Sequence, residues 1–268
     1  MKHQQPEPFV DMHCHLLPGL DDGPVTWGQS VAMAEAAVAA GIRTVVATPH
    51  QLGAYADSQA SAIRSQAARL QELLLARGIP LEVLPGAEVC VEPDLAARIL
   101  SGQVLTLADR YRHVLVEMPP AIFLPLGRLL DDLAAAGMVG VLAHPERNAG
   151  ALAKPALLES LVDEGCLVQV TAASVTGLLG PRVRSFVESL VRQGLVHFIA
   201  TDSHQPGERL SAMQRAWQRI ARLAGDDVAG QLCCRNPARA AAGEPVLQGR
   251  QQPVRSSRRR WLGRRKVA

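Results

Sequence analysis

The sequence predicts an α/β fold in which seven parallel strands, each followed by a helix, close into a barrel with a metal site at its C-terminal mouth. Short apolar runs alternate with longer segments of helical periodicity along most of the 268 residues. This length suits one barrel, and a hydrophobic fraction of 48% is enough for one aliphatic core. Histidines and carboxylates follow the predicted strands, where parallel barrels build their active sites. An open doubly wound sheet is the alternative.

The predicted elements follow one another in order, and local signals support their ends. Strands are expected at residues 9–12, 42–47, 81–84, 113–116, 139–143, 167–170 and 197–200. Helices are expected at residues 27–40, 57–77, 94–100, 126–136, 155–164, 182–192 and 210–223. Thr26 with Gln29 three residues later is typical of a helix start, and Gly41 and Gly78 each follow a predicted helix. No break in this rhythm precedes the C-terminal tail, so residues 1–249 are predicted to form one domain.

Composition narrows the class of protein. No run of about 18 unbroken apolar residues predicts a membrane span, and the polar residues 1–10 do not resemble a signal peptide. The five cysteines are irregularly spaced and contain no CxxC pair, which indicates a reduced, cytoplasmic setting.

Residues 250–268 differ from the rest of the chain in charge. They contain eight basic residues and no acidic residue, with Trp261 and Leu262 among the arginines. Two readings of this tail stay open. A run of like charge is usually a disordered, solvated extension. It also suits contact with an anionic membrane surface, such as the inner face of the cell membrane, to which each basic residue contributes about 1 kcal/mol. Nucleic acid is not expected, because no recognition motif accompanies the charge.

Candidate site residues stand directly after the predicted strands. Five of the eight histidines and several carboxylates occupy these positions, namely His13, His15, Asp21, Asp22, His50, Glu88, Glu117, His144, Asp202 and His204. The His-x-His pair on an extended segment points both imidazoles to the same side. Borderline divalent metals favour such mixed imidazole and carboxylate ligands. Each short motif alone is a weak signal, but their shared place at the strand ends predicts a metal site at the mouth of the barrel.

Longer stretches carry a resemblance to a known family. The chain is similar to bacterial manganese-dependent protein-tyrosine phosphatases of the polymerase and histidinol phosphatase (PHP) superfamily. The resemblance covers roughly residues 9–240 and rests on Asp11-Met12-His13-Cys14-His15-Leu16-Leu17-Pro18-Gly19-Leu20-Asp21-Asp22-Gly23-Pro24, Ala47-Thr48-Pro49-His50, Pro85-Gly86-Ala87-Glu88, Val114-Leu115-Val116-Glu117, Ala143-His144-Pro145-Glu146-Arg147 and Thr201-Asp202-Ser203-His204. Met118-Pro119 replaces the usual Phe-Pro, and Thr201 and Ser203 replace the more frequent Ser and Ala. None of these departures removes a metal ligand.

The resemblance implies a distorted, TIM-like barrel of seven strands that holds three divalent ions. Mn²⁺ is the expected metal, with Fe, Zn, Co or Mg as alternatives. The implied ligands are His13, His15, Asp22, His50, Glu88, Glu117, His144, Asp202 and His204. The resemblance also implies a hydrolase of capsule or exopolysaccharide biosynthesis whose partner is a phosphotyrosine protein, namely an autophosphorylated tyrosine kinase. The basic tail lies outside the resemblance and inherits no role from it.

Two arginines are candidates for the catalytic work. Arg147 and Arg209 are predicted to hold the phosphate, because the guanidinium fork matches its oxygens. For Arg209, a salt bridge at a helix start is the competing role. The loop 51–58, which carries Tyr55, is expected to cover the mouth.

Other chemistries compete with this interpretation. A small-molecule phosphomonoesterase of the histidinol-phosphate type and a non-catalytic metal-binding regulatory module both stay open. A cysteine phosphatase is disfavoured, because no glycines lie between Cys233 and Arg239 to let the backbone cradle a phosphate. Cys14 is expected to point into the core.

Overall fold

The computed structural model describes residues 7–250, and these residues contain nine strands in two sheets. The strand orders are β1-β2-β4 and β3-β5-β6-β7-β8-β9. All pairings between these strands are parallel, as the sequence predicts. The strands are β1 (Phe9–Cys14), β2 (Ile42–Ala47), β3 (His50–Gln51), β4 (Glu82–Pro85), β5 (Glu88–Cys90), β6 (His113–Glu117), β7 (Val139–Leu142), β8 (Leu167–Thr171) and β9 (Phe198–Ala200).

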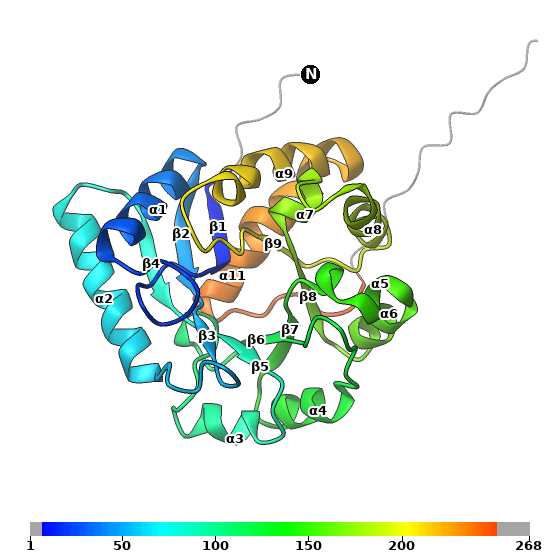
Figure 1. Ribbon diagram of the computed structural model, residues 1–268. Coiled ribbons are helices and arrows are strands. Elements are labelled where there is room, and N and C mark those ends of the chain that lie inside the picture. The colour runs from blue at the N-terminus through cyan, green and yellow to red at the C-terminus, as the bar shows by residue number, and fades with distance from the viewer. Residues whose placement is uncertain (1–6, 251–268) are drawn as a thin grey trace, which may run out of the picture.

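Helices surround the curled strands (Figure 1). They are α1 (Trp27–Ala39), α2 (Ala60–Ala76), α3 (Leu95–Leu100), α4 (Gly127–Ala135), α5 (Ala149–Ala153), α6 (Ala156–Asp163), α7 (Ala172–Thr176), α8 (Pro181–Arg192), α9 (Glu208–Ala224), α10 (Asp226–Gly230) and α11 (Asn236–Ala242). Two short 3-10 helices (Leu107–Asp109 and Pro145–Arg147) and a π-helical turn (Gln231–Arg235) complete the set. The predicted start of α1 is confirmed, since Gln29 N donates to Thr26 Oγ1 at 3.3 Å.

The structure has nine strands where seven were predicted, because two short strands, β3 and β5, follow the predicted strands at 42–47 and 81–84 after interruptions of two residues. Thr48-Pro49 separates β2 from β3, and Gly86-Ala87 separates β4 from β5. Proline has no N–H to donate to a strand ladder. A Cβ at Gly86 would lie 2.7 Å from Val46 Cγ1, so a larger residue there would force the neighbouring segment to shift. Beyond the interruption the pairing resumes with His50 opposite Glu88.

Hydrogen bonds join the first strand to the end of the last one. Cys14 forms an isolated parallel bridge with Ser203, just beyond β9. His15 N donates to Ser203 O at 2.8 Å, and Asp202 N donates to His13 O at 2.8 Å. Thr201 N also donates to Asp11 Oδ1 at 2.9 Å. The curled sheets are therefore linked at the point where His13, His15 and Asp202 emerge.

Two apolar clusters form the core. The larger one packs the strands against the surrounding helices. The smaller one includes Met12 of β1, Leu115 of β6, Phe198 of β9 and Ala240 of α11, which Figure 1 draws in the middle of the view. This short helix was not predicted, because its alanines give little periodic signal. Aliphatic packing thus fills the interior and leaves the polar residues at the carboxyl ends of the strands.

The last described residues are tied to the body of the protein. His197 Nε2 donates to Gly249 O at 2.9 Å, and Arg250 forms ion pairs with Glu159 and Asp163 at 3.0 and 3.2 Å. Residues 251–268, which contain most of the predicted basic tail, lie outside the described residues. Among residues 7–250, no helix has the length and hydropathy that crossing a bilayer requires.

Candidate metal centre

All nine residues predicted as metal ligands lie together at the carboxyl ends of the strands. They form three overlapping groups, and within each group one ligand atom per residue lies within 4.8 Å of the others. The groups are His15, Asp22, His50 and His204; then His13, Glu88, His144 and Asp202; and finally His50, Glu88 and Glu117. His50 and Glu88 each belong to two groups, so the three groups make one continuous cluster.

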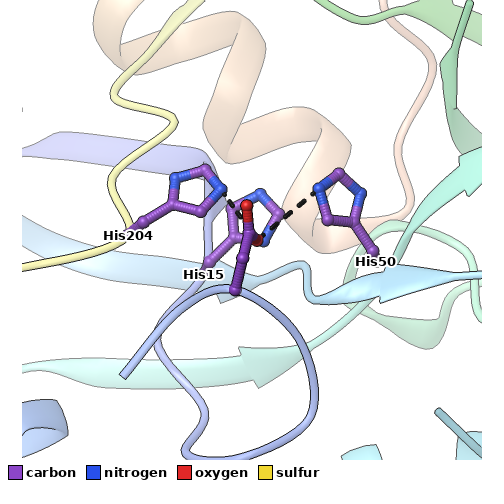
Figure 2. Close-up of side chains that lie close together, drawn as sticks. His15, His50 and His204 are labelled. Carbon is purple, nitrogen blue, oxygen red and sulfur yellow. Dashed lines mark ion pairs between the residues drawn. The ribbon is translucent and has the colours of Figure 1, made fainter. Parts of the chain in front are cut away.

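The first group combines three histidines from distant parts of the chain with Asp22. Figure 2 shows the rings of His15, His50 and His204 gathered around one space, on the segment after β1, on β3 and on the loop after β9. The rings of His15 and His204 stack with centroids 3.8 Å apart. Asp22 Oδ1 lies 3.2 Å from His204 Nε2 and 3.8 Å from His50 Nε2. This arrangement offers imidazole nitrogens and a carboxylate oxygen to one ion.

Glu88 lies at the middle of the cluster. Its side chain is almost fully buried, with Oε2 3.1 Å from His13 Nε2 and Oε1 2.9 Å from His144 Nε2. His50 Nδ1 lies 3.3 Å from the same Oε2. A carboxylate with both oxygens directed at different histidines is suited to bridge two cations. Glu117 lies at the edge of the cluster, 3.7 Å from His50 and 3.8 Å from His144.

The buried carboxylates and histidines of the cluster shift one another's pKa values. Burial by itself raises the pKa of Glu88, but the charges of His13 and His144 hold it well below its usual range. Burial lowers the pKa of His15, yet hydrogen bonds with Asp21 and Glu88 raise it to about 10. Buried carboxylates require a partner charge or a metal. Protonated histidines, or divalent cations held by the same side chains, would supply that charge.

Two residues outside the predicted ligand set, Asp21 and Gln169, orient the histidines. His15 Nδ1 donates to Asp21 Oδ2 at 2.5 Å, and His13 Nδ1 donates to Gln169 Oε1 at 3.0 Å. Each bond fixes the proton on Nδ1 and directs Nε2 into the cluster, which is the usual way that proteins orient metal-binding imidazoles. The sequence carries a signal for Gln169, because this polar amide interrupts the apolar run of β8. In the structure its side chain is fully buried.

Two candidate ligands have unusual backbone conformations. His144 has φ 28° and Asp202 has φ 52°, in the left-handed region that residues with side chains rarely adopt. Such conformations persist where the surrounding structure enforces them, and they concentrate at functional sites. At Asp202, hydrogen bonds from Arg147 to the carboxylate and from Arg209 to the carbonyl oxygen help to hold this backbone conformation.

Both predicted phosphate-binding arginines lie beside the cluster. Arg147 Nη1 donates to Asp202 Oδ2 at 2.5 Å, while Arg209 Nη1 donates to Asp202 O at 2.6 Å. The side chain of Arg147 is 40% exposed and that of Arg209 is 39% exposed. A pocket of 430 Å³ is lined by both arginines together with Asp22 and His204. The arginines therefore border the space through which an anion would reach the cluster.

The loop 51–58 and the two cysteines considered in the sequence can also be located in the structure. Tyr55 stacks on His50 with ring centroids 5.0 Å apart, so the loop 51–58 borders the cluster. Cys14 and Cys233 are fully buried, and burial raises the pKa of both thiols well above the usual range. A thiolate nucleophile requires the opposite environment. Neither cysteine is suited to attack phosphate.

The fold and the cluster define a class of protein: a parallel α/β fold with a centre of histidines and carboxylates at the carboxyl ends of its strands. Within this class, the chain belongs to the family described as "Capsular polysaccharide synthesis, CpsB/CapC", whose model matches residues 9–241.

Individual relatives cover nearly the whole chain. The chain is 34% identical to tyrosine-protein phosphatase YwqE of Bacillus subtilis, across 95% of this chain and 99% of YwqE. It is 26% identical to tyrosine-protein phosphatase CpsB of Streptococcus pneumoniae, across 85% of this chain and 96% of CpsB.

Solved structures agree with the sequence comparisons. The crystal structures of YwqE and CpsB, described as metal-dependent tyrosine phosphatases, include a chain that matches with a TM-score of 0.86 at 34% identity. That match covers 91% of this chain and 99% of the other. The lactonase Lmo2620 of Listeria monocytogenes matches with a TM-score of 0.60 at 12% identity, which shows a shared fold alone.

Proposed function

We propose that this protein hydrolyses phosphotyrosine in proteins and depends on divalent metal ions to do so. The observation that most directly supports this proposal is the cluster of five histidines and four carboxylates in three overlapping groups, bordered by Arg147 and Arg209. The similarity to YwqE and CpsB supports the choice of phosphotyrosine as the substrate. The proposed substrate protein is an autophosphorylated tyrosine kinase of capsule or exopolysaccharide biosynthesis.

We further propose that the three groups hold three ions, with Mn²⁺ as the native metal. The donor set suits this assignment, because imidazole and carboxylate ligands together favour borderline divalent metals. Bound divalent ions supply neutralisation of the phosphoryl charge and lower the pKa of water toward neutrality. Asp21 and Gln169 keep the Nε2 atoms of His15 and His13 directed at the ions.

The residues around the cluster would position the substrate. Arg147 and Arg209 bind the phosphoryl oxygens, since both guanidinium groups border the 430 Å³ pocket beside Asp22 and His204. Tyr55, flat against His50, forms an aromatic wall at the entrance for the tyrosine ring. The competing role of Arg209 as a helix-start salt bridge is compatible with phosphate binding. Arg209 Nη1, in the first turn of α9, lies 3.5 Å from Asp202 Oδ2 and donates to the Asp202 carbonyl oxygen at 2.6 Å.

We propose that the fold is a distorted barrel of seven strands. In this count β2 with β3 and β4 with β5 each form one interrupted strand, since each pair is separated by only two residues. Residues 1–249 would make up the domain, and residues 250–268 the basic tail that contacts an anionic membrane surface on the cytoplasmic side. The bonds that tie Gly249 and Arg250 to the body give the tail a fixed starting point.

The test is phosphatase activity before and after metal exchange. Purified protein treated with chelator should lose activity on a phosphotyrosine peptide, and Mn²⁺ should restore it. Fe²⁺, Zn²⁺, Co²⁺ and Mg²⁺ are compared in parallel, and histidinol phosphate serves as the small-molecule substrate. A Cys233→Ala variant should keep the parent activity, because the thiol is fully buried and burial raises its pKa well above the usual range. Full activity after exhaustive metal removal, or preference for histidinol phosphate, would overturn the proposal.

A further inference from the structure

Arg147, the proposed phosphate-binding residue, lines two pockets at the candidate metal centre. One is the 430 Å³ pocket that Arg209 also lines, and the other has a volume of 240 Å³ and is lined by Glu117 and His144 as well. The Arg147 side chain is partly exposed and pairs with Asp202. A long side chain of this kind keeps much of its rotamer freedom, which ligand binding must then remove. The position of its guanidinium therefore depends on how firmly the backbone beneath it is held.

Glu146, directly before Arg147, is anchored to the end of β8. Its side chain is fully buried, and it belongs to none of the three ligand groups. Its Oε1 accepts hydrogen bonds from Thr171 N at 2.8 Å, from Thr171 Oγ1 at 3.1 Å and from Ser174 Oγ at 2.8 Å. Glutamate is seldom buried this completely without such partners. One carboxylate oxygen therefore ties the segment that carries Arg147 to β8 and α7.

Asn148, directly after Arg147, is anchored to the loop that follows β6. Its side chain is also buried, and its Nδ2 donates to Pro119 O at 2.8 Å and to Ile122 O at 2.9 Å. Its Oδ1 accepts from Ala151 N at 2.9 Å, which caps α5. In the sheet β7 lies between β6 and β8, so Glu146 and Asn148 hold the segment after β7 from its two sides.

The backbone between the two anchors is itself closed by hydrogen bonds. Arg147 N donates to His144 O at 3.0 Å, and Asn148 N donates to Pro145 O at 3.0 Å, around the 3-10 turn Pro145–Arg147. The proline ring also restricts φ at the start of this turn. Because a short turn with bonded ends moves as one piece, the contacts of Glu146 and Asn148 fix the backbone of Arg147 as well.

We propose that Glu146 and Asn148 are positioning residues, which hold Arg147 so that its guanidinium meets the phosphoryl group without rearrangement. This inference rests on the proposed function. Donors that are in place before charge develops contribute most to catalysis, and a displacement of about 1 Å can lower a rate about 100-fold. Each anchor acts through Arg147 and not through the metal ions. Losing an anchor therefore weakens phosphate binding and turnover while the metal content stays the same.

The test is a double-mutant cycle in the Mn²⁺-loaded protein. It compares the parent, Glu146→Ala, Arg147→Ala and the variant with both substitutions. Glu146→Ala should lower kcat on a phosphotyrosine peptide about tenfold when Arg147 is present, and less than about twofold when Arg147 is already alanine. A general loss of structure would lower kcat by the same factor in both backgrounds. Isothermal titration with inorganic phosphate measures the same coupling without turnover, and metal analysis should give the parent Mn²⁺ content.

Milder variants keep the test valid if Glu146→Ala does not fold. Glu146→Gln retains an acceptor oxygen for the three donors that meet at Oε1, so it should recover most of the kcat that Glu146→Ala loses. Asn148→Ser keeps a side chain suited to cap α5 but is too short to reach the loop after β6. It should lower kcat and phosphate affinity, again only when Arg147 is present.

Gln71→Ala is the matched control. The Gln71 side chain also joins two segments through backbone groups, since its Oε1 accepts from Val83 N at 2.7 Å and its Nε2 donates to Leu81 O at 3.2 Å. These bonds connect α2 to the start of β4. Losing them should lower stability in urea and leave kcat and phosphate affinity unchanged.

The outcomes separate this inference from the proposed function. An equal loss of kcat and of phosphate affinity with and without Arg147 would overturn the positioning role. A lower Mn²⁺ content in Glu146→Ala would also overturn it, because Glu146 would then support the ligand His144. So would parent-like values in both Glu146→Ala and Asn148→Ser. If the cycle shows the coupling for inorganic phosphate but the parent protein hydrolyses no phosphotyrosine peptide, the proposed function fails while the positioning role stands.

Discussion

Asp21 tests whether the residues behind the histidines control metal binding. Its carboxylate accepts three hydrogen bonds: Oδ2 from His15 Nδ1 at 2.5 Å and from His50 N at 3.0 Å, and Oδ1 from Gly23 N at 2.9 Å. Asp21→Asn keeps the shape of the side chain but has only one acceptor oxygen. Whichever way the amide turns, its NH₂ group faces an N–H donor, so at least one bond is replaced by a repulsive contact.

The expected loss follows from that count. An unsatisfied or lost bond to a charged group costs about 1.5–3 kcal/mol. At about 1.4 kcal/mol for each factor of ten, this corresponds to roughly 10- to 100-fold weaker metal binding, which matches the usual effect of removing a residue that orients a ligand histidine. Isothermal titration of metal-free protein with Mn²⁺ measures the change directly. Circular dichroism of the same samples shows whether the fold is retained.

Two further variants make the result specific. Asp131→Asn removes the same charge from the exposed face of α4 and should leave metal binding unchanged. Asp22→Asn removes a candidate ligand and should reduce the number of ions bound as well as their affinity. If Asp21→Asn bound Mn²⁺ as tightly and in the same number as the parent protein, the orienting role inferred from the His15 bond would be wrong.

Two other predictions concern turnover and acid stability. Arg147→Ala should lower turnover about 100-fold with metal content unchanged, and Arg147→Lys should recover part of the loss, because a point charge cannot reproduce the guanidinium fork. Steady-state kinetics with metal analysis measures both, and parallel loss of metal would contradict the assignment. Burial lowers the pKa of His197 from 6.5 to about 4, so its stabilising contribution is present above pH 6.5 and is lost as the pH falls toward 4, by up to about 3 kcal/mol. Urea titrations across this range should show a flatter pH dependence for His197→Gln, and an unchanged slope would contradict this reading.

The candidate site could be predicted from the sequence because a parallel topology brings strand ends together. His13, His50 and His144 are far apart in the chain, yet each stands at or just after the end of a predicted apolar strand, and parallel strands end on the same side. The sequence could not separate Asp21 from Asp22 in the same way. Only the fold shows that Asp21 is turned inward to His15 while Asp22, 53% exposed, faces His204.

Other parts of the structure lay beyond sequence patterns for physical reasons. The helix α11 is built from alanines and consists of only seven residues, so it has no amphipathic stripe to detect. Asp202 pairs with both arginines and has a backbone φ of 52°, a conformation that no residue type other than glycine favours in sequence.

The interruptions that changed the strand count also explain how the centre is built. A regular strand would continue the ladder through Thr48-Pro49 and Gly86-Ala87, and side chains beyond those points would follow the alternation of the strand. Instead Glu88 N donates to Pro49 O at 3.2 Å, and the ladder resumes with His50 paired to Glu88. The two side chains then face each other, with His50 Nδ1 3.3 Å from Glu88 Oε2. These are the two residues that belong to more than one ligand group. The absent proline N–H and the close approach at Gly86 therefore contribute directly to the overlap that makes three groups into one cluster.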